Sequence, residues 1–266
     1  MKSKQVKIIC FSPTKSTRKI LENIASGISN QIADILDLTR PSAALTTNRE
    51  IFTELALIGV PVYGGRVPVD AEKRLQKLKA DGIPAVIVVV YGNRGYGDAL
   101  LELNDIAIKC GFKPIAAGAF IAEHSFSIDE YPIAKSRPDA DDLNKAKAFG
   151  AEIGKLMNND NVSTQSSTIK LPGNFPYKER SKSAGFSPET DKSICINCKK
   201  CVDVCPTGAI SANDVTITDP DKCILCKACV KVCENGARIA KHPAFLDFAK
   251  HLCTNCQLRL EPDTFI

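Results

Sequence analysis

Eight of the twelve cysteines lie between residues 195 and 233, in two runs of identical spacing. The first run reads CINCKKCVDVC and the second CILCKACVKVC, so each is C-x2-C-x2-C-x3-C, and the second begins 28 residues after the first. Repetition at a fixed offset indicates two related half-units packed about a local pseudo-twofold axis. These residues are therefore the first place to look for chemistry.

The spacing suits assembly of iron–sulfur clusters. Three thiolates within seven residues can wrap a tight loop around one [4Fe–4S] cube, and the fourth cysteine of each run ligates the other cube. Such cross-ligation would join two halves that are together too small to be held by apolar burial alone. The predicted ligand sets are Cys195, Cys198, Cys201 and Cys233 for the first cluster and Cys223, Cys226, Cys229 and Cys205 for the second.

Zinc and disulfide bonds are the alternatives for these cysteines. Paired CxxC motifs can bind zinc, but four ligands per zinc leave no purpose for the regular third cysteine. A disulfide scaffold requires a secreted chain, and the apolar run 6–11 is too short for a signal peptide or a membrane span. We therefore expect a cytoplasmic protein without a membrane span.

The segment resembles a bacterial ferredoxin that carries two [4Fe–4S] clusters. Pro206 follows Cys205, as that motif expects, whereas Glu234 follows Cys233. The departure bears on the environment and potential of the first cluster more than on its existence.

The formal net charge of +5 does not indicate a nucleic-acid partner. An oxidised cube with its four thiolates carries about −2, so two cubes would bring the net charge to about +1. The sequence also lacks a basic stripe interleaved with aromatic residues. We expect no nucleic-acid role.

Residues 1–158 alternate short apolar runs with segments of helical period, which is typical of a parallel sheet covered on both faces. The run Val86–Val90 indicates a strand buried on both sides. The pattern predicts an α/β, doubly wound five-stranded parallel sheet whose ligand sits at the carboxyl ends of the strands. The predicted strands are 6–11, 32–38, 55–60, 84–91 and 115–121; the predicted helices are 16–28, 69–80, 98–110 and 139–157, with a ragged helix in 39–53.

Three loops follow strands at this edge, namely 12–17, 61–68 and 91–98. The first is rich in hydroxyls and opens into a helix, where free N–H groups and the helix dipole suit a phosphate. The other two contain glycines, which let backbone approach a flat ring, and tyrosines that can stack on it. The alternative is that glycine-rich turns simply end strands in a sheet of this kind.

With these loops the domain resembles a flavodoxin over about residues 4–158, which implies FMN and the strand order 2-1-3-4-5. The phosphate-loop pattern S/T-x-T-G-x-T of that family maps onto Ser12, Thr14, Lys15 and Thr17, with Lys15 in the glycine position. The stacking candidates are Tyr63, Tyr91 and Tyr96. The FMN-binding residues so implied are Ser12, Thr14, Lys15, Ser16, Thr17, Pro61, Val62, Tyr63, Gly64, Gly65, Arg66, Tyr91, Gly92, Asn93, Arg94, Gly95 and Tyr96.

The remainder of the chain is divided by composition. Residues 159–190 are predicted to be a linker, within which the proline-fixed segment 171–177 could dock on a domain. A ferredoxin domain at 191–240 and a helical tail at 241–266 follow. This order resembles fused flavodoxin–ferredoxin proteins of anaerobes. In the tail, Cys253 and Cys256 with His251 lack a fourth metal ligand, so buried or spare thiols are the simpler interpretation.

The sequence leaves more than one function open. The first hypothesis is an electron-transfer protein that converts between the one-electron chemistry of two clusters and the two-electron chemistry of FMN. It would serve a redox partner protein or a small electron acceptor, with Lys199, Lys200, Lys227 and Lys231 as possible orienting charges.

The second hypothesis is an FMN-dependent reductase of a small organic acceptor, fed by its own ferredoxin domain. Its candidate proton donors are His124, Tyr63 and Tyr96, although His124 is equally typical of a capping or surface residue. The third is an FMN-free ferredoxin with a structural sheet domain. No dinucleotide fingerprint supports direct NAD(P)H oxidation.

Overall fold

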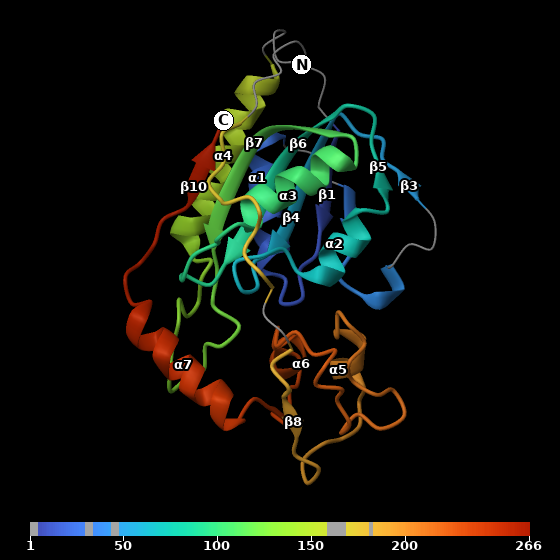
Figure 1. Ribbon diagram of the computed structural model, residues 1–266, viewed down its shortest axis with the longest axis vertical. Helices are drawn as coiled ribbons and strands as arrows, with labels where there is room; N and C mark the ends of the chain where they lie inside the picture. The colour runs from blue at the N-terminus through green and yellow to red at the C-terminus, as the bar shows by residue number, and fades with distance from the viewer. Residues whose placement is uncertain (1–4, 30–33, 44–47, 159–168, 181–182) are drawn as a thin grey trace.

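The computed structural model describes residues 5–29, 34–43, 48–158, 169–180 and 183–266. Its central sheet has the order β10-β7-β6-β4-β1-β2, in which β1, β2, β4, β6 and β7 are parallel and β10 pairs antiparallel with β7. The predicted order 2-1-3-4-5 is confirmed, and the C-terminus adds a sixth strand (Figure 1). The strands are β1 Val6–Cys10, β2 Asp34–Asp37, β4 Leu55–Pro61, β6 Ile83–Tyr91, β7 Phe112–Ile121 and β10 Asp263–Phe265.

Helices cover both faces of this sheet. Helices α1 (Ser16–Ile28) and α4 (Ala140–Met157) pack on one face, and α2 (Val69–Leu75) and α3 (Ala99–Lys109) on the other (Figure 1). In β6, Val86, Val88 and Val90 face the first pair and the residues between them face the second, so all are buried. Burial on both sides explains why this strand is a continuous apolar run.

Two segments depart from the predicted elements. The helix expected over 69–80 ends at Leu75, because Leu78 is buried in extended backbone where β5 (Leu78–Lys79) pairs with β3 (Arg49–Glu50). The stretch 39–53 holds the short 3-10 helix η1 (Pro41–Ala43) and β3 in place of a ragged helix. The expected positions 32–33 and 44–47 lie outside the described residues.

Helices α1 and α4 approach closely through glycines. A Cβ added at Gly150 would lie 2.0 Å from the carbonyl oxygen of Ile24, and one at Gly27 would lie 2.0 Å from that of Lys147. Backbone atoms cannot move aside as a flexible side chain can. Only glycine therefore permits this contact.

Gly150→Ala is expected to destabilise the fold by about 1–3 kcal/mol, because overpacking would force the two helices apart. Gly154→Ala, one turn later on the same helix, is the matched control, since its Cβ would meet no atom closer than 3.4 Å. Alanine there should stabilise by up to about 1 kcal/mol through helix propensity. Denaturant unfolding of both variants measures the difference, and equal shifts would contradict the close approach.

The cysteine-rich unit, residues 189–239, lies beside the sheet domain (Figure 1). Its short helices α5 (Lys200–Asp203) and α6 (Ala228–Lys231) occupy equivalent places in the two cysteine runs, and β8 (Glu189–Thr190) pairs antiparallel with β9 (Arg238–Ile239). Its small core includes Ala209, Ile210 and Val215. Within the described ranges, no helix has the length and apolar character needed to cross a membrane.

The tail returns to the sheet domain. Helix α7 (Pro243–Asn255) accounts for the helical part of the predicted tail, and an extended segment then runs to β10 at the edge of the sheet (Figure 1). The segment 171–177 also lies on the sheet domain, where the backbone N–H groups of Asn174 and Lys178 donate to the Asp98 carboxylate at 2.8 and 2.7 Å. Of the predicted linker, residues 159–168 and 181–182 lie outside the described ranges.

Candidate functional site

The loop after β1 adopts a left-handed turn at its lysine. Lys15 has φ 64° and immediately precedes α1, so it takes the conformation that glycine has in the family pattern. The turn is closed by the Lys15 N–H, which donates to the carbonyl of Ser12 at 3.1 Å, and by the Arg18 N–H, which donates to Ser12 Oγ at 3.1 Å. A non-glycine residue held in this region is typical of a functional loop.

A solvent-open hollow adjoins this loop. It is lined by Thr14, Lys15 and Ser16 of the loop, by the first turns of α1 and by residues that follow β7. Lys231 reaches it from the cysteine-rich unit and forms an ion pair with Glu123 at 3.1 Å. The start of a 13-residue helix and several cationic side chains together favour an anionic group at this place.

The loops 61–68 and 91–98 touch each other at glycines. Gly64 and Gly65 form a tight turn of positive φ between Tyr63 and Arg66, whose backbones exchange two hydrogen bonds of 3.1 Å. A Cβ on Gly97 would lie 2.9 Å from the Cα of Gly65. The structure thus brings the two predicted ring loops together at the sheet edge.

Several side chains predicted to contact FMN have partners within the protein. Arg66 forms two hydrogen bonds with Glu102 and stacks on the ring of Tyr177 of the linker. Tyr91 is buried in the core, where its ring contacts Tyr96 edge-on at 5.4 Å. These contacts fix the shape of the two loops.

Partners of two more loop residues come from the tail. The Asn93 amide donates to the carbonyls of Cys256 and Leu258 at 2.9 and 2.8 Å, and its oxygen accepts from the N–H of Leu260 at 3.1 Å. Arg94 lies over the ring of Phe248, 5.7 Å from its centre. These contacts span more than 150 residues of sequence, and nothing local in the loop predicts them.

The eight cysteines of the two runs gather around two hollows. One is lined by Cys195, Cys198, Cys201 and Cys233 and the other by Cys205, Cys223, Cys226 and Cys229. Each predicted ligand set, including the exchanged fourth cysteine, thus surrounds its own hollow.

Left-handed residues shape both cysteine loops in the same way. Asn197 and Lys199 of the first loop have φ 54° and 60°, and Leu225 and Lys227 at the equivalent positions have 53° and 59°. Such turns aim successive backbone N–H groups inward, as anion-binding loops do.

Hydrogen-bond donors reach sulfur atoms of the second set. The N–H of Ala209 donates to Cys205 Sγ at 3.2 Å, and Arg238 lies 3.7 Å from Cys229 Sγ. Donors of this kind tune the potential of a cluster. The residues present therefore fit iron–sulfur clusters.

The second cysteine set faces the sheet domain through a buried arginine. Arg74 of α2 donates to the carbonyls of Leu38 and Thr39, at 2.8 and 2.6 Å, and to that of Pro206, at 2.6 Å. Thr39 Oγ1 in turn accepts from the N–H of Ser12 at 2.8 Å. Arg74 thereby joins the loop after β1 to Pro206, which follows a predicted cluster ligand. No sequence motif predicts this link.

The second set packs on the sheet domain close to Tyr63 of the ring loop. Ile224, between Cys223 and Cys226, packs against the apolar core of the sheet domain. Burial raises the pKa of Tyr63 well above its ordinary value, and the charges of Cys226 and Cys223 contribute to the rise. One set of predicted cluster ligands therefore lies on the same domain as the predicted FMN loops.

Residues 194–237 match the family model described as a 4Fe-4S dicluster domain. This part of the chain is a ferredoxin-type iron–sulfur domain. It is joined to a sheet domain whose strand order is that of a flavodoxin-like fold. The search of curated proteins returned no match.

Solved structures similar to this chain include flavodoxins. A flavodoxin from the domain Archaea is 13% identical and the match covers 57% of this chain and 98% of that one, with a TM-score of 0.39. A flavodoxin, WrbA-like protein from Agrobacterium tumefaciens is 16% identical over 58% and 98% of the two chains, with a TM-score of 0.39. The Flv1 flavodiiron core from Synechocystis is 14% identical over 58% of this chain and 36% of that one, with a TM-score of 0.41.

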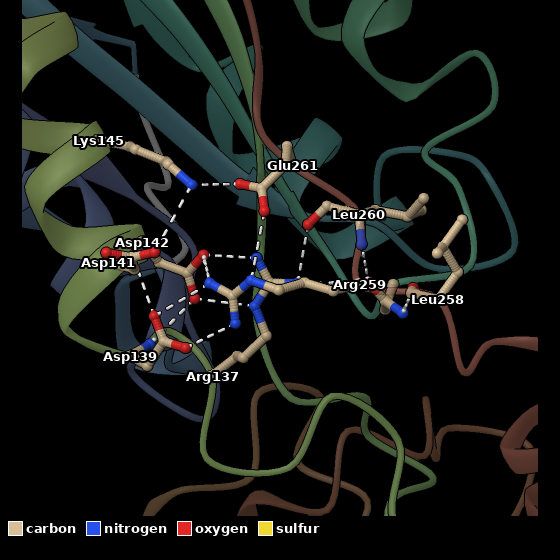
Figure 2. A network of polar contacts seen from close by, with 10 residues as sticks. Arg137, Asp139, Asp141, Asp142, Lys145, Leu258, Arg259, Leu260 and Glu261 are labelled. Carbon is tan, nitrogen blue, oxygen red and sulfur yellow. Dashed lines mark hydrogen bonds and ion pairs between the residues drawn. The ribbon is translucent and has the colours of Figure 1, made fainter.

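A polar network, buried at its centre and exposed at its rim, fastens the tail to the sheet domain (Figure 2). Arg137 pairs with the buried Asp142 through hydrogen bonds of 2.8 and 2.5 Å and also donates to the carbonyl of Leu260 at 2.9 Å. Arg259 of the tail pairs with Asp139 at 2.7 Å, and Lys145 pairs with Glu261. The tail is thus held by charge as well as by the pairing of β10.

The two tail cysteines differ in their surroundings. Cys256 supplies its carbonyl to Asn93, while Cys253 is partly exposed. Cys10 and Cys110 are buried in the sheet domain.

His124 follows β7 and lies against the loop 91–98. A Cβ on Gly92 would lie 2.3 Å from its ring, and the N–H of Phe126 donates to His124 Nδ1 at 3.0 Å. Burial, together with the charges of Arg94 and Lys227, lowers the pKa of His124 to about 4. The ring is neutral at pH 7, with its proton on Nε2.

The other candidate donor, Tyr96, donates a hydrogen bond to Asp263 at 2.9 Å, and the pKa of Tyr96 is raised by burial and by that bond.

His124→Gln is expected to reduce the loss of stability on acidification. The pKa of His124 falls from an ordinary 6.5 to about 4 in the folded state, so the unfolded state binds more protons between these values. The contribution of the neutral ring to the free energy of unfolding is complete above pH 6.5 and is lost as the pH falls toward 4. Between pH about 7.5 and about 5.5 the wild type should lose about 1.4 kcal/mol of this contribution. Urea unfolding at both values measures it.

The matched control is His251→Gln, because His251 is exposed on α7. This variant should keep the wild-type dependence on pH. If His124→Gln and His251→Gln lose the same stability on acidification, the neutral state of His124 does not cause the pH dependence of the wild type.

Proposed function

We propose that the chain is an iron–sulfur flavoprotein that carries electrons between two [4Fe–4S] clusters and FMN. The observation that carries this proposal is the position of the second cysteine set, which is held against the sheet domain by the packing of Ile224 and by the bond from Arg74 to the carbonyl of Pro206. FMN can exchange electrons singly or in pairs whereas a cluster exchanges one at a time, so the bound flavin would supply the conversion. The residues of the chain hold the groups and set their potentials.

The sheet edge fits FMN through backbone more than through side chains. The left-handed Lys15 and the hydroxyls of Thr14 and Ser16, 3.0 Å apart, would hold the phosphate at the start of α1. The glycine turns of loops 61–68 and 91–98 would let backbone contact the ring edge. Arg66, Asn93 and Tyr96 would act indirectly, by fixing the shape of these loops.

The two cysteine sets would have different places in the relay. The second set is nearer the sheet edge, because Arg74 binds the carbonyl beside Cys205 and Lys227 donates to the carbonyl of Ser127 at 2.7 Å. Both bonds are buried and fix the distance between the domains. A fixed arrangement removes the need for a domain motion in each transfer.

The test is anaerobic preparation of the whole protein with iron, acid-labile sulfide and FMN quantified. We expect about eight irons per chain, the content of two cubes, together with one FMN. A redox titration in one cuvette would then show both chromophores bleaching in the same sample. About eight irons with no FMN taken up would instead identify a ferredoxin with a structural sheet domain.

A second candidate is an FMN-dependent reductase of a small organic acceptor, which the position of His124 favours. Its Nδ1 accepts a hydrogen bond, so Nε2 holds a proton beside the loop 91–98. A neutral imidazole held this way can orient an acceptor or donate a hydrogen bond to it. Turnover of a panel of quinones and enoates tests this, with His124→Gln expected to reduce turnover while FMN content stays unchanged.

A further inference from the structure

The two cysteine loops have the same backbone and opposite surroundings. In the second loop Leu225, Cys226, Lys227 and Ala228 are all buried, with 4–9% of their surface exposed. The equivalent residues of the first loop, 197–200, are all exposed. Among the described cysteines, only Cys198 is exposed. Of the two equivalent loops, the second is therefore covered by the rest of this chain, and the first faces solvent.

The buried loop shows what kind of surface such a loop binds. Ile224 packs against the apolar core of the sheet domain. Next to the cysteines, the Lys227 ammonium donates to the carbonyl of Ser127 and lies 5.5 Å from the ring centre of Phe245. Lys231, one turn later, pairs with Glu123. The surface that covers the second loop therefore has an apolar centre, with oxygen acceptors and a carboxylate around it.

The exposed loop presents an isoleucine and a lysine at the equivalent positions. Ile196, the counterpart of Ile224, is 67% exposed, and Ile194 beside it is 45% exposed. Lys199, the counterpart of Lys227, is exposed, and Lys192 adds a further ammonium. This surface, residues 192–200, combines exposed isoleucines with cations directly over the first cysteine set.

We propose that the surface 192–200 docks a small acidic one-electron carrier protein, which exchanges electrons with the chain through the first cluster. The inference rests on the proposed function for the relay that follows. In the reducing direction one electron leaves the reduced iron–sulfur centre of the carrier and enters the first cluster, so the carrier is oxidised by one electron. No bond forms or breaks. The oxidised carrier then dissociates.

Charge favours such a carrier over a second copy of this chain. Two copies meeting at this surface would bring Lys192 and Lys199 of each against those of the other, and like charges face to face are unfavourable. An acidic carrier instead gains steering toward the ammonium groups. The apolar centre supplies the contact that persists once the two surfaces meet.

The test is stopped-flow reduction of the whole, anaerobically prepared protein by a reduced acidic two-[4Fe–4S] ferredoxin, with dithionite as a small reductant for comparison. Cluster and flavin absorbance are followed separately. Ile196→Asp is expected to lower the second-order rate constant with ferredoxin by about tenfold or more, and Lys192→Glu by about threefold with a weaker dependence on salt. Both should keep the wild-type rate with dithionite. Ile108→Asp, at an isoleucine of α3 that is 51% exposed, is the control and should change neither rate.

The outcomes separate this inference from the proposed function. If both variants accept electrons from ferredoxin as fast as the wild type, the docking surface is wrong even if the flavin bleaches. If the variants slow cluster bleaching and the flavin never bleaches in any protein, the docking surface stands and the relay fails. Analytical sedimentation tests whether the surface 192–200 instead binds a second copy of this chain. If the wild type is a dimer that Ile196→Asp dissociates, and the rate with ferredoxin is unchanged, the proposal is overturned.

Discussion

Replacing Asp142 with alanine is expected to lower the free energy of unfolding by about 3–5 kcal/mol, because the change leaves a buried guanidinium without its carboxylate. Asp142 is fully buried, and its oxygens accept from Arg137 at 2.8 and 2.5 Å and from Arg259 at 3.3 Å. It also accepts from the N–H of Asp139 and so completes the cap of α4. One substitution therefore breaks the pair, the cap and part of the attachment of the tail (Figure 2).

Asp141→Ala is the matched control for this prediction. Asp141 is the preceding residue on the same helix and its side chain is 73% exposed, so its removal should change stability by no more than about 0.5 kcal/mol. Anaerobic urea unfolding compares the two variants. Because Arg137 also holds the carbonyl of Leu260, limited proteolysis should cut the tail of Asp142→Ala first. Equal costs for the two variants would mean that the buried pair is not what holds this corner together.

The parts of this fold that were predicted correctly have local causes. Helix α1 begins and ends at the predicted residues because its apolar positions recur at helical spacing and hydroxyl residues stand at its start. The strand β6 is visible because burial on both faces demands an uninterrupted apolar run. The cysteines that line each hollow are grouped as the motif predicts, and their role as cluster ligands stays a prediction.

The parts that were missed depend on distant partners. The strand β10 has three residues, too few for a periodic pattern, and exists because Thr264 meets Gly118 at the open edge of β7. The helix expected over 69–80 stops early because β5 pairs with β3, which is itself two residues long.

The predicted site shows the same limit. Asn93 in a glycine-containing loop resembles a ligand contact, and only the return of the tail reveals the carbonyls it binds. Sequence thus places the loops of the candidate site correctly and leaves the roles of their side chains open.

Replacement of a cysteine in each set is expected to interrupt the proposed relay at different points. Cys226→Ala removes a predicted ligand of the second cluster and should lower the iron content from about eight to about four per chain. The first cluster should still bleach with a reduced acidic ferredoxin, while the flavin stays oxidised. The physical reason is position: Cys226 lies in the buried loop, whose neighbour Ile224 packs against the core of the sheet domain.

Cys198→Ala is the matched partner, since it occupies the equivalent position in the first loop and also removes one predicted ligand. It should lose the first cluster, and reduction by ferredoxin should then fail for both remaining chromophores. Anaerobic stopped-flow absorbance with iron analysis distinguishes the two patterns, and FMN content shows whether the sheet domain is intact. Identical behaviour of the two variants would contradict a relay with an order.

A third variant separates loss of a cluster from loss of its placement. Arg74→Met keeps all eight cysteines but removes the buried hydrogen bonds to Thr39 and Pro206 that join the phosphate loop to the second set. We expect full iron and FMN content, unchanged bleaching of the clusters and slower bleaching of the flavin. The change would affect the step between cluster and flavin alone, because Arg74 holds the two domains in position without contacting a predicted ligand sulfur. Unchanged flavin kinetics in Arg74→Met would mean that the domain contact is stable without this side chain, and the buried loop around Cys226 would then be sufficient to hold the second cluster at the sheet edge.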